Sequence, residues 1–211
     1  MMRILFYGDS NTWGYNAQTG MRYANRFTKQ IQKAFPEDEI LEEGLCGRTL
    51  CHSDPYSLEE RNGSKTISMV LKTHEPLDLV VILLGTNDAK RVYGTNALTS
   101  LEKGMDLFMH EAMDPDNFKR SIQTPRFLMV TPPKLHKEYA SCMRTRIHFG
   151  QEGYEMLEQS AMPLKKMANK WQCDFLDLED IRAGKLDAIH LDEEEHCQVA
   201  EKLIKKLGEY R

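Results

Sequence analysis

The chain has 211 residues, with 28 Lys or Arg against 32 Asp or Glu, which gives a formal net charge of −4 at pH 7. This small negative charge, with basic residues dispersed along the chain, argues against a nucleic-acid-binding protein. No apolar run approaches the roughly 20 residues that a membrane span needs, and the N-terminus lacks a secretory signal pattern. We therefore expect a cytoplasmic protein with no membrane partner.

Cysteine usage agrees with that location. The cysteines are odd in number and scattered, and no two form a C-x-x-C pair, so we expect neither a disulfide framework nor a zinc site. They are Cys46, Cys51, Cys142, Cys173 and Cys197.

Short apolar runs indicate the strands of a sheet. They are continuous rather than alternating, which is typical of parallel strands that are buried on both faces. In chain order the predicted strands are Ile4–Tyr7, Glu39–Leu41, Leu79–Leu84, Phe127–Val130 and Phe175–Leu178.

Between these runs, apolar residues recur at spacings of three and four, which predicts amphipathic helices. The helical segments are Tyr23–Phe35, Leu98–Phe108, Tyr154–Ala168 and Val199–Leu207. The last one has the clearest boundaries, because Asp192 and Glu195 have the spacing of a capping box and Gly208 is placed to end the helix.

The alternation of strands and helices predicts one α/β domain over residues 1–211, built on a doubly wound parallel sheet of about five strands. The least regular segment is Leu135–Gly150, which we interpret as a lid, a subunit contact or a plain loop. Its basic part, Met143–His148, is expected to be a solvated loop rather than a nucleic-acid contact.

Four polar clusters stand where ligands bind in open α/β sheets, beyond the carboxyl ends of the strands. Three of them follow predicted strands, and the fourth precedes the last helix. They are Gly8–Asn11, Gly44–Arg48, Gly85–Asp88 and Asp187–His190.

These clusters hold the groups that acyl transfer requires: a nucleophile, a base, a group that orients the base, and donors for the oxyanion. Ser10 is a candidate nucleophile, His190 a candidate base and Asp187 its candidate orienting acid. Gly47, through its N–H group, and Asn87, through its side-chain amide, are candidate oxyanion donors. Each residue alone is more often a turn or capping residue. The prediction of an acyl-transfer site therefore rests on the presence of all these residues at strand ends of one domain.

The four clusters together resemble the SGNH hydrolases, also called the GDSL esterase/lipase family. The family is named for Ser, Gly, Asn and His in four blocks, and here these blocks occur in the family's order across nearly the whole chain. They read Gly8-Asp9-Ser10-Asn11, Gly44-x-x-Gly47-Arg48, Gly85-Thr86-Asn87-Asp88 and Asp187-x-x-His190. The stretches "GDSNTWG" and "GLCGRT" are most similar to the arylesterase/acyltransferase-like branch.

The resemblance implies a flavodoxin-like, three-layer α/β/α fold and a serine esterase that acts on short-chain acyl or aryl esters through an acyl-enzyme. It assigns Ser10, His190 and Asp187 to a catalytic triad, and the Ser10 N–H, the Gly47 N–H and the Asn87 amide to the oxyanion hole. It implies a small-molecule ester as substrate and no metal or cofactor. The branch includes oligomers, so a homo-oligomer is a further expectation.

Several alternatives remain open at this point. The same family includes acyltransferases, carbohydrate acetyl esterases and lysophospholipases, and a non-catalytic binding module with this fold is disfavoured because the triad is complete. A metal site within residues 187–196 is another alternative, because this segment contains Asp, Glu and His, but it is disfavoured because these residues lack the spacing of a known metal-binding motif. An α/β-hydrolase is disfavoured as well, because the residues around Ser10 lack the second glycine of the G-x-S-x-G motif that carries the nucleophile in that fold.

Four residues beside the catalytic candidates are predicted to shape the substrate pocket. They are Asn11, Trp13, Cys46 and Arg48. For Cys46 an inert, buried thiol is the favoured interpretation, because buried free cysteine generally behaves as a small apolar residue.

Overall fold

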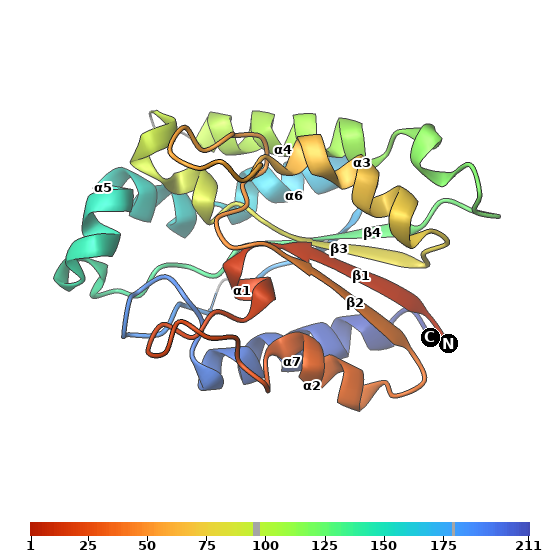
Figure 1. Cartoon of the computed structure of the whole chain (residues 1–211), viewed down its shortest axis with the longest axis horizontal. Helices are drawn as coiled ribbons and strands as arrows, with labels where there is room; N and C mark the ends of the chain where they lie inside the picture. Colours follow the sequence, from red (N-terminus) through yellow and green to blue (C-terminus); the bar gives the residue numbers. More distant parts are fainter. Residues whose placement is uncertain (95–97, 179) are drawn as a thin grey trace.

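A computed structural model describes residues 1–94, 98–178 and 180–211. Its centre is a sheet of five parallel strands in the order β2-β1-β3-β4-β5 (Figure 1). The strands are β1 (Arg3–Gly8), β2 (Glu39–Gly44), β3 (Leu79–Leu83), β4 (Arg126–Val130) and β5 (Asp174–Leu176). Every predicted strand is confirmed, with boundaries that differ by a few residues.

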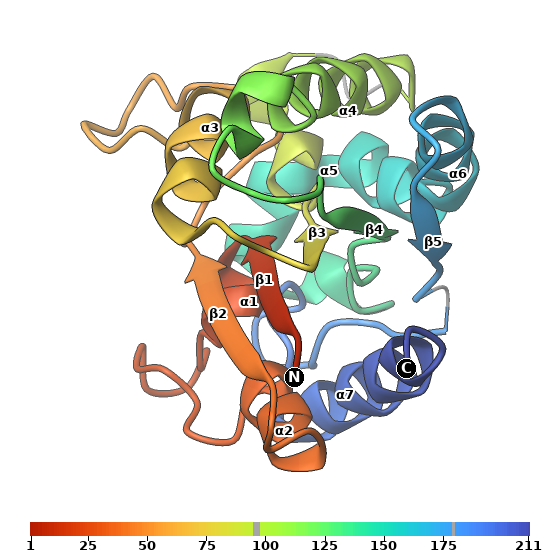
Figure 2. The same ribbon diagram turned by 90° about the vertical axis from the view of Figure 1, so that its right-hand side faces the viewer.

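Helices cover both faces of this sheet, which gives the predicted three-layer α/β/α fold (Figures 1 and 2). One face carries α2 (Phe27–Ala34) and α7 (Glu193–Gly208), and the other carries α3 (Gly63–His74), α4 (Leu98–Ala112), α5 (Met143–Glu158) and α6 (Ala161–Lys170). The short helix α1 (Ser10–Trp13) lies beyond the end of the sheet that is opposite to the chain termini.

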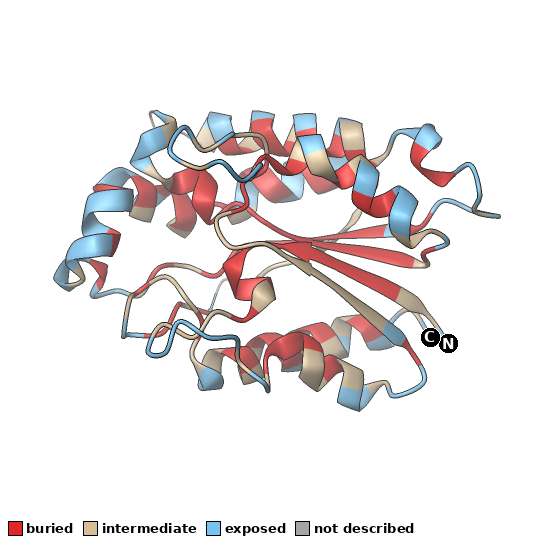
Figure 3. Ribbon diagram, in the orientation of Figure 1, coloured by how far each residue is buried: buried red, intermediate tan, exposed pale blue. Residues whose placement is uncertain are grey.

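The alternation of side chains along the strands fills two separate cores. In β1, Leu5 and Tyr7 belong to the core beneath α3 and α4, whereas Ile4 and Phe6 belong to the core beneath α2 and α7. All four side chains are buried, so both faces of β1 are covered (Figure 3). This explains why the strand sequences are continuously apolar.

Two helix predictions need correction. The segment Tyr23–Phe35 is helical only from Phe27. Tyr23 lies outside the helix and packs edge-on against the ring of His196 at 5.3 Å, so its place in the apolar spacing reflects this contact. The segment Tyr154–Ala168 is divided between α5 and α6. Pro163 lies in the first turn of α6, where its missing N–H group is tolerated, and it could not stand inside one continuous helix.

Helix α3 is not among the predicted helical segments, although the alternation of elements requires a helix between β2 and β3. The prediction of a solvated loop over Met143–His148 was wrong in its conformation, because these residues form the first turns of α5. Segment Leu135–Gly150 is therefore partly helical, with a 3₁₀ helix at Tyr139–Ser141 ahead of α5. Across the described ranges, no helix is both long and apolar enough to cross a membrane.

A partly buried acid, Glu42, connects β2 to α2. Arg26, which precedes α2, donates two hydrogen bonds of 2.6 Å to the Glu42 carboxylate, and Thr28 donates another. Burial raises the pKa of Glu42, but these hydrogen bonds and the charges of Arg26 and Arg22 outweigh it and lower the pKa to about 2. The ionised form of Glu42 is thus the form that the fold stabilises.

We predict that Glu42→Gln lowers the free energy of unfolding at pH 7 by about 2–3 kcal/mol. Because the folded-state pKa of about 2 lies below the unfolded value of 4.5, this stabilisation is complete above pH 4.5 and is lost as the pH falls toward 2. Urea unfolding at several pH values measures the difference. Glu201→Gln, at an exposed site on α7, serves as control. An equal difference between Glu42→Gln and wild type at pH 2.5 and pH 7 would contradict the assignment.

Candidate active site

The polar clusters of the sequence meet at the carboxyl edge of the sheet. In the register of the strands, Gly8 pairs with Gly44 of β2 and with Leu83 of β3, so the segments that follow these three strands start side by side. Ser10 is the first residue of α1, and Asp9 caps this helix by accepting a hydrogen bond of 2.9 Å from the Asn11 N–H. The cap turns the chain directly after β1 and leaves Ser10 at the edge.

Ser10, His190 and Asp187 form a chain of hydrogen bonds. The distance between His190 Nε2 and Ser10 Oγ is 2.9 Å, and that between His190 Nδ1 and Asp187 Oδ2 is 2.6 Å. The other Asp187 oxygen accepts the N–H groups of Ile189 at 3.1 Å and His190 at 3.0 Å. Burial raises the pKa of Asp187, but these donors and the His190 imidazole outweigh it, so the pKa is lowered and the carboxylate form is favoured.

The segment that carries His190 is fastened to α1 and α5. Asn11 Oδ1 accepts the Leu191 N–H at 3.0 Å, and Asn11 Nδ2 donates to the Ile189 carbonyl at 3.4 Å. Thr145 of α5 donates a hydrogen bond of 2.5 Å to the Asp187 carbonyl. These contacts come from distant parts of the chain and together fix where the imidazole lies.

Two candidate oxyanion donors lie beside Ser10. Asn87 Nδ2 donates to the Arg48 carbonyl at 3.0 Å, which orients the amide, and its distance to Asp9 Oδ2 is 3.5 Å. Gly47 adopts a φ of 84°, a left-handed conformation that suits glycine. Among the described residues nothing accepts the Gly47 N–H, so it is available to a ligand.

A buried carboxylic acid supports this edge of the site. Asp88 accepts the Leu50 N–H with both oxygens, at 3.0 and 3.1 Å, and so joins the end of β3 to the segment after β2. Burial raises the pKa of Asp88 to about 7. The result is a firm connection between the segment of Gly47 and that of Asn87.

A cavity of about 450 Å³ opens over these groups. It is lined by Ser10, Asp187, His190, Gly47 and Asn87, so all the residues predicted for catalysis and for the oxyanion hole surround one space. Tyr15, which the sequence did not indicate, also lines it, with its ring centroid 4.4 Å from that of His190.

The four predicted pocket residues have different positions. Cys46 lines the cavity and is partly buried, and burial raises the pKa of its thiol, so its position agrees with the prediction of a pocket residue. Asn11 instead holds the His190 segment, and Trp13 packs against Tyr15 at 6.3 Å. Arg48 is buried beneath the edge, where it donates to the Gly8 carbonyl at 2.9 Å.

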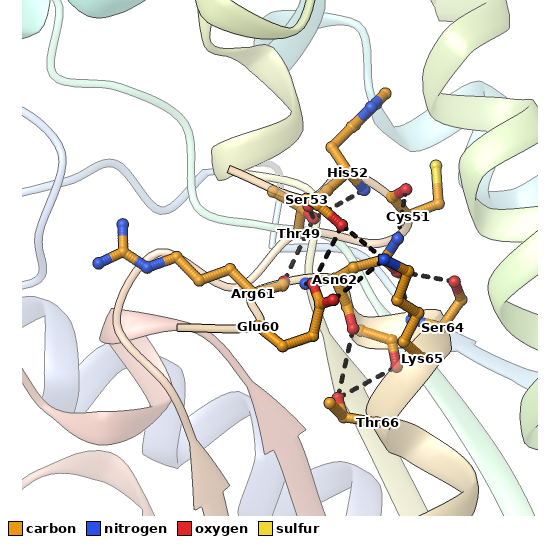
Figure 4. Close-up of polar contacts among 11 residues, drawn as sticks. Thr49, Cys51, His52, Ser53, Glu60, Arg61, Asn62, Ser64, Lys65 and Thr66 are labelled. Carbon is orange, nitrogen blue, oxygen red and sulfur yellow. Dashed lines mark hydrogen bonds and ion pairs between the residues drawn. The ribbon is translucent and has the colours of Figure 1, made fainter. Parts of the chain in front are cut away.

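The segment between β2 and α3 forms one wall of the cavity and is held by its own hydrogen bonds (Figure 4). Asn62 donates to the Cys51 carbonyl at 2.7 Å, and Lys65 binds both Ser53 and Glu60. The Arg61 side chain extends away from this network in Figure 4 and lines the cavity instead. Few periodic signals mark such a segment, which is why the sequence did not indicate Arg61.

The ligand-type residues of 187–196 are engaged in other contacts. Asp192 and Glu195 form the predicted capping box, with the Asp192 N–H donating to Glu195 at 3.0 Å. The His196 ring is buried beside Phe27 at 5.9 Å, and burial lowers its pKa to about 4. In the part of the chain that the structure describes, no three acidic, His or Cys side chains group as metal ligands would.

The model of the GDSL-like lipase/acylhydrolase family matches residues 6–194. The chain belongs to this family. The GDSL family assignment agrees with the resemblance inferred from the four sequence blocks, and it makes the protein a carboxylic ester hydrolase. No curated protein sequence matched the chain.

Solved structures of esterases are similar along nearly the full length. A carbohydrate acetylesterase family member from Sinorhizobium meliloti is 32% identical, with a TM-score of 0.86 and coverage of 98% of this chain and 97% of that one. Est24, a carbohydrate acetylesterase from the same organism, is 27% identical, with a TM-score of 0.87 and full coverage of both chains. The aryl esterase of M. smegmatis is 27% identical, with a TM-score of 0.85 and 99% coverage of both chains.

We predict that Asn11→Ala destabilises the protein by about 1–3 kcal/mol, because the Leu191 N–H is left buried without an acceptor. The freed His190 segment should also lower kcat for ester hydrolysis. Thermal unfolding and assays with 4-nitrophenyl acetate measure both effects. Asn169→Ala, at an exposed position of α6, is the matched control. Wild-type stability and kcat in Asn11→Ala would contradict the role given to Asn11.

Proposed function

We propose that this enzyme hydrolyses short-chain acyl esters, with Ser10 as nucleophile, His190 as general base and Asp187 as the acid that orients the imidazole. One observation carries the proposal: His190 lies within hydrogen-bond distance of both partners, 2.9 Å from Ser10 Oγ and 2.6 Å from Asp187 Oδ2. A hydroxyl is a weak nucleophile at neutral pH and needs such a base beside it.

In the proposed reaction, Ser10 Oγ attacks the carbonyl carbon of the ester while His190 Nε2 takes the hydroxyl proton. The tetrahedral intermediate collapses, the bond from carbon to the alcohol oxygen breaks, and His190 returns the proton to the leaving alcohol. Water then attacks the acyl-enzyme with His190 again as base, which releases the acid and restores Ser10. Asp187 stays ionised and stabilises the imidazolium in both halves, consistent with its lowered pKa.

The negative charge that develops on the carbonyl oxygen is assigned to the Ser10 N–H, the Gly47 N–H and the Asn87 amide. Donors held in place before the reaction cost no reorganisation when the charge develops. The hydrogen bond from Asn87 to the Arg48 carbonyl and the unoccupied N–H of Gly47 support this assignment.

The size of the site favours a short acyl group. A volume of about 450 Å³ lies in the lower half of the range of small-molecule pockets, about 300–1,000 Å³, and it must hold both the acyl group and the alcohol. The similar structures described as carbohydrate acetylesterases and an aryl esterase support acetyl esters of sugars or phenols as the substrate class.

Ser10→Ala should lower kcat for 4-nitrophenyl acetate at least about 10⁴-fold, because the acyl-enzyme cannot form. In the wild type, kcat/KM should fall from acetate to butyrate to octanoate esters. Ser100→Ala, at an exposed position of α4, is the control and should behave as wild type. Comparable turnover by Ser10→Ala and wild type would refute the mechanism, and a rate that rises with acyl length would refute the substrate class.

Asn87→Ala should reduce kcat about 10²–10³-fold with a much smaller change in KM, since an oxyanion donor acts mainly in the transition state. Circular dichroism and thermal unfolding establish whether the variant is folded, because Asn87 also binds the Arg48 carbonyl. A folded Asn87→Ala enzyme with less than about a fivefold loss of kcat would remove Asn87 from the oxyanion hole.

A further inference from the structure

Positive charges gather around the candidate active site. Arg61, Lys90 and Arg144 line the same cavity as Ser10. They come from three separate elements: the segment between β2 and α3, the turn after β3, and the first turn of α5. Chain segments that are far apart in sequence thus place cations around one small space.

The acids of the cavity are already engaged with other partners. The lining contains two of them, Asp54 and Asp187. Asp54 accepts a hydrogen bond of 2.9 Å from Arg61, and Asp187 binds His190. Arg61 is therefore paired with an acid, whereas neither acid forms an ion pair with Lys90 or Arg144.

Lys90 and Arg144 form no ion pair with any acid of the described residues, although Asp9 and Asp54 act on Lys90 from a greater distance. Over the ranges 1–94, 98–178 and 180–211, neither side chain makes a hydrogen bond or an ion pair. Arg144 is exposed at the cavity, but Lys90 is half-buried. An unpaired ammonium group in such a position is costly, because burial removes part of its hydration.

The electrostatics of neighbouring groups agree with this geometry. Burial is the largest cause of the lowered pKa of Lys90, and the charge of Arg61 comes next. Asp9 and Asp54 oppose this effect, and Arg144 lowers the pKa by a smaller amount. Burial, Lys90 and Arg144 also lower the pKa of His148, another residue that lines the cavity. The cations act on one another across the cavity, and a bound anion would relieve this repulsion.

We propose that the substrate carries a carboxylate or phosphate group close to the ester, and that Lys90 and Arg144 bind this group. The inference rests on the proposed esterase function and narrows its substrate class to anionic esters. The two side chains suit the task, because a guanidinium can bind such an anion through two hydrogen bonds and an ammonium supplies a concentrated charge. Val92, Phe149 and Ile189 line the same cavity and offer apolar contact to the carbon skeleton.

Matched pairs of substrates test the proposal. For an anion on the alcohol side, 4-acetoxybenzoate is compared with its methyl ester. For an anion on the acyl side, mono-4-nitrophenyl adipate is compared with methyl 4-nitrophenyl adipate. Each kcat/KM is normalised to the uncatalysed rate. In at least one pair the anionic ester should be preferred about tenfold or more, and added salt should reduce this preference.

Lys90→Met and Arg144→Met should each lower the ratio of anionic to neutral kcat/KM about 10- to 100-fold, as loss of one hydrogen bond to a charged group predicts. Two variants are needed because Lys90 directly follows the turn that holds Asn87. Lys103→Met is the matched control; Lys103 is an exposed lysine of α4 outside the cavity lining and its loss should leave the ratio unchanged.

The proposal is overturned if neither anionic ester is preferred, or if both variants keep the wild-type ratio. It is also overturned if each variant slows the two members of a pair equally, because Lys90 and Arg144 would then act only on the position of neighbouring groups. A wild-type enzyme that uses Ser10 to hydrolyse 4-nitrophenyl acetate but ignores substrate charge would refute the anionic subsite while leaving the proposed function intact.

Discussion

The arrangement of the site depends on the close contact of α1 with the backbone at the ends of β1 and β2. A Cβ atom at Gly44 would lie 2.3 Å from the Trp13 nitrogen, so no larger residue could stand there without moving α1. Gly44 pairs with Gly8, and Gly8 pairs with Leu83 in β3. The sheet register therefore fixes the point along the sheet at which β1 ends and α1 begins with Ser10. It thereby fixes how close Ser10 lies to the segments of Gly47 and Asn87.

Buried polar groups then hold these segments together from below. Asp88 joins the turn after β3 to Leu50, and Arg48 joins the segment after β2 to the Gly8 carbonyl. Hydrogen bonds between buried groups are strong because the local dielectric is low, and they restrict the motion of the segments that they join. Donors for a developing charge need such rigidity, since their benefit comes from being in place before the reaction.

The sequence predicted the parts of the structure that depend on local pattern and chain order. Strands emerged from apolar runs, and the catalytic candidates emerged from polar clusters at the strand ends. Contacts between distant segments produce no pattern of this kind in the sequence. Neither the contact of Asn11 with Leu191 nor the proximity of Lys90 to Arg144 could therefore be predicted. The predicted start of the first helix at Tyr23 was wrong for the same reason, because the spacing of Tyr23 reflects its packing against His196 rather than a helix.

The segment of Asp187 and His190 is closed on itself. The Gly184 N–H donates to the His190 carbonyl at 2.8 Å, and the Ala188 N–H donates to the Gly184 carbonyl at 3.1 Å. The acid and the base thus belong to one short segment with its own hydrogen bonds, whereas the serine belongs to α1, at the other end of the chain. If the contacts of this segment with Asn11 and Thr145 were lost, the base would move away from the nucleophile but keep its acid, so the triad could lose its alignment while the sheet stays intact.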